Sequence, residues 1–279
     1  MKRVAIIGLG WLGLPLGMSL IERSWQVSGS KTTQDGVELI RMSGINSYLL
    51  KLTPKLMCNK QDLKNLLNVD AMVITLPLTQ KITSNTQSSD YLLAIQNLVN
   101  VALNFSITQI IFTSSISVYE KSSCSINENT TVKPHSFTAR VLLEVENWLS
   151  CLKMVSVDIL RLAGLVGPKR HPGTFLVGKT VLKNGYHGVN LVHLDDVVAA
   201  IILLLSRSSG GNIYNLSAPE HPARNKFYPQ AAKKLGLPPP SFYFNVNDSR
   251  EFGRIIDGSK ICRDLGFVYC YPDPMCMIA

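Results

Sequence analysis

The opening run of the chain most restricts how it can fold. Residues 4–21 carry no charge, and glycines recur within them at positions 8, 10, 13 and 17. A signal or membrane helix is one explanation of so long an uncharged run. However, Pro15 interrupts it, and the glycine spacing is typical of a strand, a tight turn and a helix. We therefore expect a strand at 4–7, a helix from residue 12, and no membrane segment.

Short apolar runs alternate with helical patterns through the first half of the chain. The strand candidates are bounded by polar segments, and several are rich in Val and Ile. Expected strands are 4–7, 26–30, 47–50, 71–76, 109–113 and 155–162, and expected helices are 12–23, 36–42, 62–67, 91–105 and 136–152. Strands that alternate with helices pair in parallel through right-handed crossovers. This order predicts an α/β fold with a doubly wound parallel sheet.

Gly8, Gly10 and Gly13 follow the first strand and open the first helix. In a dinucleotide-binding turn the first glycine permits the tight bend, the second lets the backbone approach a pyrophosphate, and the third lets helix and strand pack closely. The helix N-terminus then offers N–H groups to the phosphates. A purely structural glycine turn is the alternative. We expect Trp11 and Leu12, inside the same turn, to belong to a cofactor site that binds NAD or NADP.

The end of the second expected strand favours NADP over NAD. An NAD site usually carries an acid there that binds the adenosine ribose. This chain has Ser30, Lys31 and Thr32, and no carboxylate occurs before Asp35. Lys31 stands where a 2′-phosphate would lie, although a solvated loop lysine is the alternative. We expect NADP, with NAD possible.

Charge and cysteine usage exclude several classes of function. The chain has 28 basic and 19 acidic residues, divided 13 to 10 in residues 1–150 and 15 to 9 in residues 151–279. This surplus is too thinly spread for a nucleic-acid-binding stripe. The six cysteines and five histidines show no zinc-site spacing. We expect a cytoplasmic protein with reduced thiols, no metal, and no nucleic-acid or membrane partner.

The basic residues of the second half suggest an anionic small-molecule substrate. No acid occurs between Asp158 and Asp195, or between Glu220 and Asp248, although both stretches contain arginine and lysine. A solvated basic face is the alternative. Because the guanidinium fork suits phosphate, we expect Arg170 and Arg224 to contribute to substrate binding more than the lysines do.

Several segments together resemble the extended short-chain dehydrogenase/reductase family, the NAD-dependent epimerase/dehydratase group that acts mainly on nucleotide sugars. The segments occur in the family's order: the glycine turn, TSSISVY at 113–119, ILRLAGLVGP at 159–168, VNLVHLDDV at 189–197 and IYNL at 213–216. The resemblance implies an NAD(P)-binding Rossmann domain at 1–168 and a small C-terminal substrate lobe at 169–279. Part of the chain, about 189–217, is expected to return to the first domain.

The resemblance also implies roles for individual residues. Ser115 corresponds to the family's substrate-binding, catalytic Ser or Thr, four residues before Tyr119. Other residues at the ends of expected strands would line the cofactor: Leu76, Pro77, Thr113, Ala163, Gly164 and Leu165. His193 and Asp196 belong to a turn and helix that support the second domain, and for them we favour a structural role.

The chain departs from the family where the acid/base pair Tyr-x-x-x-Lys should stand. If Glu144 is the anchor, those positions hold Ser136 and Arg140. With Glu146 as the anchor instead, they hold Thr138 and Leu142. The glycine spacing, GxGxxG, also differs from the family's usual GxxGxxG. The chain is therefore identified as an atypical, degenerate member.

Catalysis would then need a rearranged acid/base apparatus. Tyr119 is the tyrosine that the motifs place nearby, and Arg140 is a candidate for its cationic partner; packing of Tyr119 beside the site is the alternative. A serine or threonine hydroxyl cannot replace the tyrosine, because its pKa lies far above any working pH. Ser115, Tyr119 and Arg140 therefore form the expected catalytic set.

Two classes of function remain open. The first is an NAD(P)-dependent oxidoreductase or epimerase-like enzyme with a nucleotide-sugar-like substrate. The second is a non-catalytic NAD(P)-binding regulator or redox sensor, because a fold can outlive the loss of its acid/base pair. The opening motif also resembles UDP-sugar dehydrogenases, but those are much longer and set their catalytic cysteine among glycines, which Cys262, Cys270 and Cys276 lack. A homodimer is a possible assembly.

Overall fold

A computed structural model describes residues 2–78, 87–105, 107–120, 124–207, 210–243 and 253–278, with the backbone alone at 87–89. The chain divides into two compact units that interleave along the sequence. Unit 1 comprises Met1–Val118, Pro134–Leu160 and Ile201–Ile213, and unit 2 comprises Tyr119–Lys133, Arg161–Ala200 and Tyr214–Ala279. Ile201–Ile213, part of the stretch expected to return to the first domain, belongs to unit 1, and Tyr119–Lys133, within the expected first domain, belongs to unit 2.

A seven-stranded, mostly parallel sheet forms the centre of unit 1, and its strands β9 and β12 run on into unit 2. The spatial order is β12-β9-β7-β6-β1-β2-β3. The strands are β1 (Arg3–Ile7), β2 (Gln26–Lys31), β3 (Asn46–Leu49), β6 (Ala71–Ile74), β7 (Gln109–Ser115), β9 (Ser156–Leu162) and β12 (Ile213–Leu216). β1 pairs in parallel with both β2 and β6, so the strand order reverses between β1 and β6. In open α/β sheets such a switch point is where ligands bind.

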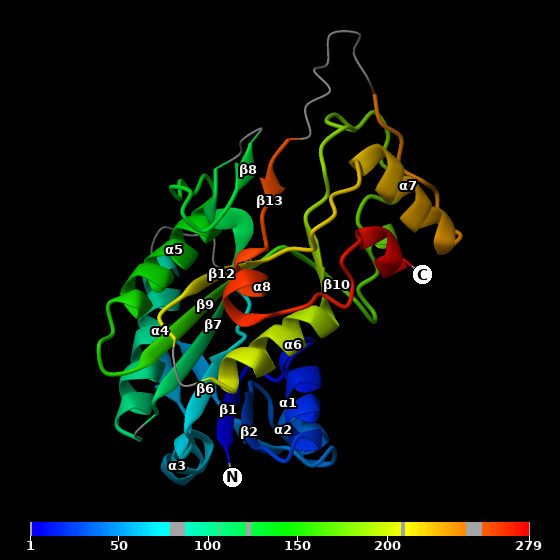
Figure 1. Ribbon diagram of the computed structural model, residues 1–279. Helices are drawn as coiled ribbons and strands as arrows, with labels where there is room; N and C mark the ends of the chain where they lie inside the picture. The colour runs from blue at the N-terminus through cyan, green and yellow to red at the C-terminus, as the bar shows by residue number, and fades with distance from the viewer. Residues whose placement is uncertain are drawn as a thin grey trace. The chain divides into compact units, whose positions relative to one another are not determined.

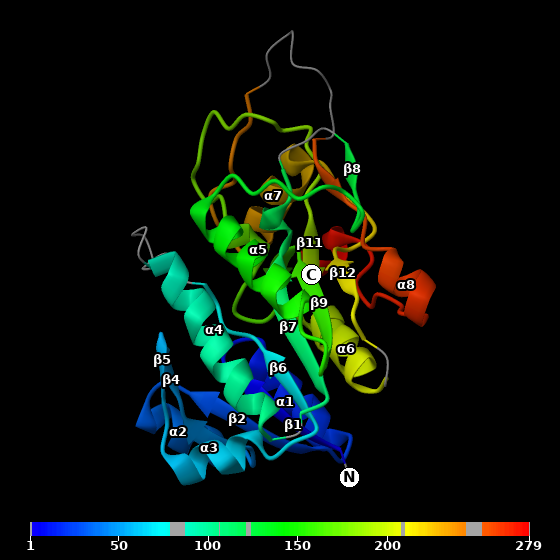
Figure 2. The same cartoon turned by 90° about the vertical axis from the view of Figure 1, so that its left-hand side faces the viewer.

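Helices cover both faces of the sheet in unit 1 (Figures 1 and 2). α1 (Gly13–Glu22) and α2 (Gln34–Arg41) lie on one face, and α4 (Gln87–Leu103) and α5 (Phe137–Ser150) lie on the other. Side-chain caps start several helices: Thr33 accepts from Gly36 N–H at α2, Asn59 from Gln61 N–H at α3 (Lys60–Leu67), and Ser136 from Ala139 N–H at α5. The expected doubly wound α/β fold is confirmed.

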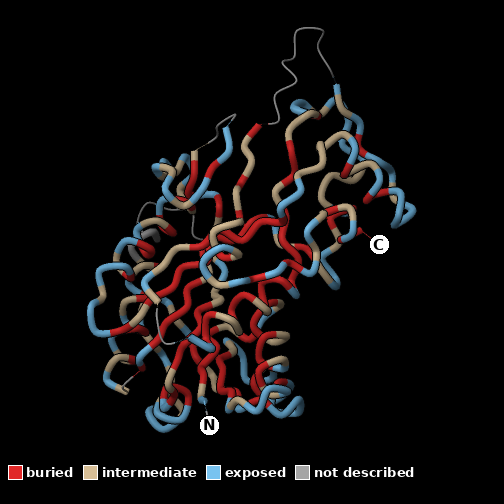
Figure 3. Tube along the Cα trace, viewed as in Figure 1, coloured by how far each residue is buried: buried red, intermediate tan, exposed pale blue. Residues whose placement is uncertain are grey.

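The core of unit 1 is the sheet itself. The strands form the buried centre of Figure 3, and Val4, Ile6, Val73 and Ile111 have no exposed surface. Near-continuous apolar runs are expected of parallel strands that are covered on both faces. The core therefore fixes the strand positions from which the connecting loops leave the sheet.

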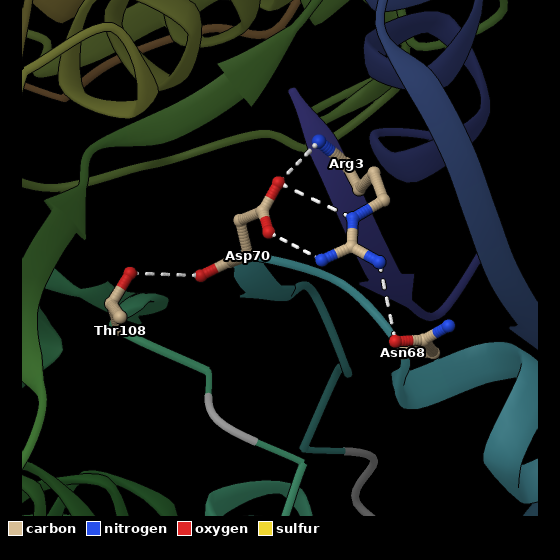
Figure 4. Close-up of polar contacts among 4 residues, drawn as sticks. All are labelled: Arg3, Asn68, Asp70 and Thr108. Atoms are coloured by element: carbon tan, nitrogen blue, oxygen red, sulfur yellow. Dashed lines mark hydrogen bonds and ion pairs between the residues drawn. The ribbon is translucent and has the colours of Figure 1, made fainter. Parts of the chain in front are cut away.

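An ion cluster ties the amino ends of β1 and β6 together (Figure 4). Arg3 Nη2 lies 2.7 Å from Asp70 Oδ1, and the Arg3 backbone N–H donates to Asp70 Oδ2 at 3.0 Å. Arg3 Nη1 also donates to Asn68 Oδ1, and Thr108 Oγ1 donates to the Asp70 carbonyl. Because hydrogen bonds from Arg3 favour the ionised carboxylate, they lower the pKa of Asp70.

Unit 2 is built from short elements around a small apolar core. β10 (Gly164–Val166) pairs with β11 (Leu191–His193), and β13 (Ile255–Ile256) pairs with β8 (Ser125–Ile126). The helices are α7 (Arg224–Lys234), α8 (Lys260–Leu265) and the start of α6 (Leu194–Leu205). The core consists of Val166, Val189, Leu191, Ala218, Phe227, Ala231, Met277 and Ile278. Residues from 166 to 278 must therefore meet before this core is complete.

The structure adds elements that periodicity did not predict. β4 (Lys51–Thr53) and β5 (Lys55–Met57) form an antiparallel hairpin. Their side chains are exposed or half-buried, so no buried face marks them in the sequence. Within the described part of the chain, no helix combines the length and the hydropathy that crossing a membrane requires.

Candidate functional site

The turn after β1 has the conformation that its glycines permit. Gly8 has φ +104°, where a side chain would be strained. A Cβ on Gly13 would lie 2.2 Å from the Gly8 carbonyl oxygen, so only glycine fits that contact. A Cβ on Gly10 would have no neighbour within 4 Å. Gly10 is thus not required by packing, and its missing side chain leaves the backbone of the turn open to a ligand.

Neighbouring strands hold this turn in place through side-chain hydrogen bonds. Ser30 Oγ, at the end of β2, accepts from Gly8 N–H at 3.1 Å. Thr75 Oγ1, just after β6, donates to the Gly8 carbonyl at 2.7 Å. α1 then begins with Leu12 as its N-cap residue, with no side-chain cap and no acid in its first turn. Such a helix start is suited to an anion.

Lys31 lies against the same turn. Its Nζ donates to the Leu9 carbonyl at 3.2 Å, so the ammonium group of this β2 residue contacts the glycine turn. Gly36, in α2, leaves room for Lys31, since a Cβ there would lie 2.8 Å from Lys31 Cε. Thr32 is exposed beside it. The structure therefore brings together the Gly8–Gly13 turn, Ser30 and Lys31, all named from sequence.

The ends of β6 and β7 carry the next predicted residues. Leu76 is half-buried, and its carbonyl accepts a hydrogen bond from Tyr91 Oη at 3.1 Å, while Pro77 is exposed. Burial raises the pKa of Tyr91, so this phenol stays protonated as a donor. At the end of β7, Thr113 Oγ1 donates to the Ile74 carbonyl of β6 at 3.1 Å.

Ser115 ends β7 and caps the short helical turn that follows (Ile116–Val118). Its Oγ accepts from Ser117 N–H at 3.1 Å. A hydroxyl that accepts one hydrogen bond still has its own proton to donate. Ser115 is half-buried, so this proton is available at the carboxyl edge of the sheet.

Neither alignment of α5 provides a tyrosine or a lysine, because the helix contains none. Ser136 is the N-cap, outside the helix, and Arg140 is exposed in the first turn. Thr138 is half-buried and Leu142 is buried. The two glutamates that served as anchors for the alignments differ in burial: Glu144 is exposed and Glu146 is buried.

Tyr119 lies in unit 2 and is buried, with 2% of its surface exposed. Its hydroxyl donates to Asn215 Oδ1 at 2.8 Å and accepts from Arg161 Nη1 at 2.9 Å. The Arg161 guanidinium also sits 4.9 Å from the centre of the Tyr119 ring. Burial raises the pKa of Tyr119, and Arg161 opposes that shift. In the described part of unit 2, the cation that contacts the Tyr119 hydroxyl is thus Arg161.

Sequence reasoning did not select the residues around Tyr119. Asn215 N–H donates to Glu128 Oε1 at 2.7 Å, and burial raises the pKa of Glu128. Arg254 Nη1 donates to the Tyr119 carbonyl at 3.1 Å. One signal was available: Arg161 is a charged residue within the apolar run of β9. A buried charge inside a strand requires polar partners.

The remaining predicted residues of unit 2 lie at element ends. Ala163 is buried and its N–H donates to the Leu216 carbonyl, whereas Gly164 is exposed and its N–H donates to the Asn190 carbonyl. Leu165 is half-buried within β10. Gly164 has little room for a side chain, because a Cβ would lie 2.7 Å from Leu191 Cδ2.

The two arginines proposed for substrate binding differ in their surroundings. Arg170 is exposed, and its backbone closes a tight turn with Gly167. Arg224, the first residue of α7, is engaged within unit 2. Its Nη1 lies 3.5 Å from the Lys183 carbonyl, and its guanidinium lies 5.7 Å from the centre of the Phe242 ring.

His193 and Asp196 hold the C-terminal segment of unit 2. The Asp196 carboxylate accepts the backbone N–H groups of Cys270 at 2.6 Å and Tyr271 at 3.2 Å. The His193 ring stacks on Tyr271 with centroids 3.9 Å apart. Burial raises the pKa of Asp196. Among the residues that the structure describes, no three His, Cys, Asp or Glu side chains are grouped to hold a metal.

Comparison with known proteins places the chain in a family. No family model matches it. It is 57% identical over 277 residues to Protein YeeZ of Escherichia coli strain K12, covering 99% of both chains. A UDP-glucose 4-epimerase structure is similar with TM-score 0.78 and 19% identity, covering 99% of this chain and 95% of that one. The structure of MoeE5 in complex with UDP-glucose and NAD is similar with TM-score 0.76 and 20% identity, covering 99% and 97%.

At that level of identity the structural likenesses establish the fold, and the YeeZ match establishes the closer kinship. The fold agrees with the ordered motifs read from the sequence. The chain therefore belongs to the same family as YeeZ, and it has the fold of the short-chain dehydrogenase/reductase and NAD-dependent epimerase/dehydratase proteins.

Proposed function

We propose that this protein binds a nicotinamide dinucleotide and acts as an NAD(P)-dependent oxidoreductase or epimerase-like enzyme. The observation that carries the proposal is the open backbone at Gly10, at the switch point of the sheet, beside a helix start with no side-chain cap. This combination suits a pyrophosphate. When bound, such a cofactor supplies a hydride acceptor or donor.

The residues of unit 1 fit the two ends of this cofactor. The Gly8–Gly13 turn with Trp11 and Leu12 would hold the pyrophosphate, and Ser30, Lys31 and Thr32 would hold the adenosine ribose. Leu76 and Pro77, which follow β6, and Thr113, near the end of β7, would contact the nicotinamide end. Ala163, Gly164 and Leu165 of unit 2 are also proposed to line the cofactor, because the family resemblance of residues 159–168 implies that role.

We further propose that NADP is preferred over NAD. Lys31 already lies at the glycine turn, through its bond to the Leu9 carbonyl. Ser30 and Thr33 accept the Gly8 and Gly36 N–H groups through their hydroxyl oxygens and keep a hydroxyl proton to donate. They would therefore meet a 2′-phosphate together with the ammonium of Lys31 and the exposed Thr32. A charge-assisted contact contributes about 1.5–3 kcal/mol, which corresponds to roughly tenfold discrimination or more.

The proposed substrate is an anionic, nucleotide-sugar-like compound. MoeE5, whose structure contains UDP-glucose and NAD, and the UDP-glucose 4-epimerase share this fold. Arg170 and Arg224 are the candidates for a phosphate contact, and Arg224 also contacts the Lys183 carbonyl and the Phe242 ring. The free cysteines are consistent with the cytoplasm that we propose as its location.

The proposed catalytic set remains Ser115, Tyr119 and Arg140. Ser115 has a proton to donate to a substrate oxygen. Tyr119 can act as an acid or base only if its hydroxyl leaves Asn215 and becomes accessible, which its burial opposes. General acid/base catalysis contributes about 10²–10⁴-fold, so we expect slow turnover.

The hydrogen-bonded, buried Tyr119 hydroxyl favours a second candidate, a non-catalytic NAD(P)-binding regulator or redox sensor. In unit 2 the Tyr119 hydroxyl has both a donor and an acceptor partner, and α5 carries no substitute tyrosine or lysine. Such a protein would bind the cofactor through unit 1 without turnover.

Fluorescence titration of the purified protein with NADPH and NADH tests the proposal. We expect saturable binding, tighter for NADPH; if neither cofactor binds, the proposed function is wrong.

Incubation of the cofactor-loaded protein with UDP-glucose and UDP-N-acetylglucosamine, followed by chromatography of the sugars, distinguishes the enzyme from the sensor. Conversion that is lost in Ser115→Ala supports the enzyme, whereas tight binding that distinguishes redox states without conversion supports the sensor.

A further inference from the structure

Three consecutive hydroxyl side chains end β7, and each makes a different hydrogen bond. Thr113 donates to the Ile74 carbonyl of β6, and Ser115 accepts from Ser117 N–H. Ser114 instead donates from Oγ to Oε1 of Glu146 on α5. Because side chains alternate along a strand, Ser114 belongs to the face opposite Thr113 and Ser115. One strand end is therefore anchored on both faces.

Glu146 is a carboxylate in the core of unit 1, and only 1% of its surface is exposed. The same helix carries Glu144, which is exposed. Burying a carboxylate is unfavourable unless hydrogen bonds compensate, and an apolar side chain of similar size often gives equal or greater stability. Stability alone therefore does not account for a glutamate at this position.

The contact can set how α5 sits against the end of β7. α5 packs on β7 and on the turn at Ile116–Val118, and Ser150 Oγ donates to the Glu146 carbonyl at 2.8 Å, one turn further along. Apolar packing between a helix and a strand tolerates small slides, whereas a hydrogen bond between two buried groups fixes one position. A slide of β7 would move Thr113 and Ser115 together.

We propose that Glu146 is a positioning residue that acts through Ser114 to fix Thr113 and Ser115 for the nicotinamide end of the cofactor. This inference rests on the proposed function, because it assigns that end of the cofactor to the end of β7. Glu146 touches no ligand itself. Its effect is expected on binding of the whole dinucleotide and not on its adenosine end.

The test compares variants that remove or keep the hydrogen bond. Ser114→Ala and Glu146→Leu remove it, while Ser114→Thr and Glu146→Gln keep a hydroxyl and an acceptor oxygen. Glu144→Gln is the matched control on the exposed side of α5. Each protein is titrated with NADPH, and with 2′,5′-ADP as a probe of the adenosine end, well below its melting temperature so that the folded state is measured.

We expect Ser114→Ala and Glu146→Leu each to weaken NADPH binding by about fivefold, the size of one net hydrogen bond. Their 2′,5′-ADP affinity should stay unchanged, the double variant should lose less than the sum of the two single losses, and Ser114→Thr and Glu146→Gln should recover binding. Unchanged NADPH affinity in both removal variants, or equal loss for both ligands, would overturn the inference. Wild-type protein that binds none of NADPH, NADH and 2′,5′-ADP would overturn the proposed function as well, so the two failures are distinct.

Discussion

The two edges of the sheet in unit 1 use polar side chains in opposite ways. At the amino edge, Arg3 donates hydrogen bonds to both Asn68 and Asp70, so the three side chains form one cluster (Figure 4). At the carboxyl edge, Ser30 and Thr75 bond to the backbone of the glycine turn. The first arrangement satisfies charge locally, and the second holds a loop with its Gly10 backbone open. The contrast is that an ion pair closes the amino edge, whereas the carboxyl edge leaves open the backbone at which we propose that the cofactor binds.

The largest expected effect is at the carboxyl edge. Gly10→Val should lower NADPH affinity by about a hundredfold, equivalent to about 2.7 kcal/mol, because the side chain enters the space proposed for the pyrophosphate. Its melting temperature should stay close to that of the wild type, since nothing lies within 4 Å of a Cβ there. Titration and calorimetry on one sample measure both quantities.

Gly13→Ala is the matched comparison for this prediction. Its Cβ would lie 2.2 Å from the Gly8 carbonyl oxygen, so it should lose stability as well as affinity. If Gly10→Val binds NADPH as the wild type does, the glycine turn is structural only and the contrast between the edges disappears.

An intermediate effect is expected at the end of β2. Lys31→Ala should reduce the preference for NADPH over NADH by about tenfold, because it removes the charge that we propose faces the 2′-phosphate. Gly36→Ala should reduce it less, since its methyl group displaces the Lys31 chain without removing it. Lys55→Ala, an exposed lysine of β5, is the control. An unchanged ratio of the two affinities in Lys31→Ala would show that Lys31 is merely solvated.

The smallest effect is expected at the amino edge. Asp70→Asn should lower the melting temperature at neutral pH by about 2 °C or less, because the ion pair with Arg3 is partly exposed. NADPH affinity should not change.

The pH dependence of this effect follows from the sign of the shift. Arg3 lowers the pKa of Asp70 below its unfolded value, so the stabilisation is present above the unfolded pKa of about 4. It is lost as pH falls through the folded pKa. Melting curves of both proteins from neutral to acid pH should converge at the acid end, and added salt should narrow the gap. A gap that widens on acidification would contradict this assignment.

Sequence periodicity predicted the large elements because they have strongly patterned buried faces. β1 and β6 are apolar throughout their buried stretches, β7 has the apolar run Ile110–Phe112, and α4 repeats Leu92, Ile95 and Val99 at helical spacing. The β4–β5 hairpin escaped prediction because neither of its strands has a buried face. The lack of buried residues thus accounts for the missed β4–β5 hairpin.

The sequence predicted the part of the candidate site that is formed by backbone. It did not predict the pairs of side chains whose residues lie far apart in the sequence. Glycine spacing identified the turn at Gly8–Gly13 directly. The contacts of Tyr119 with Arg161 and Asn215 span 42 and 96 residues, and that of Ser114 with Glu146 spans 32. Single-sequence patterns report neighbours within a turn or a strand, so partners at these separations require the fold.

The interleaving of the two units also bears on how the chain is made. Translation proceeds from the N-terminus, and β12, the edge strand beside β9, emerges only at residues 213–216. Until then a nascent chain presents β9 as an open edge, which invites pairing with another chain. A chain truncated shortly before residue 213 should therefore aggregate more readily than the full chain. No single continuous gene fragment encodes either unit by itself.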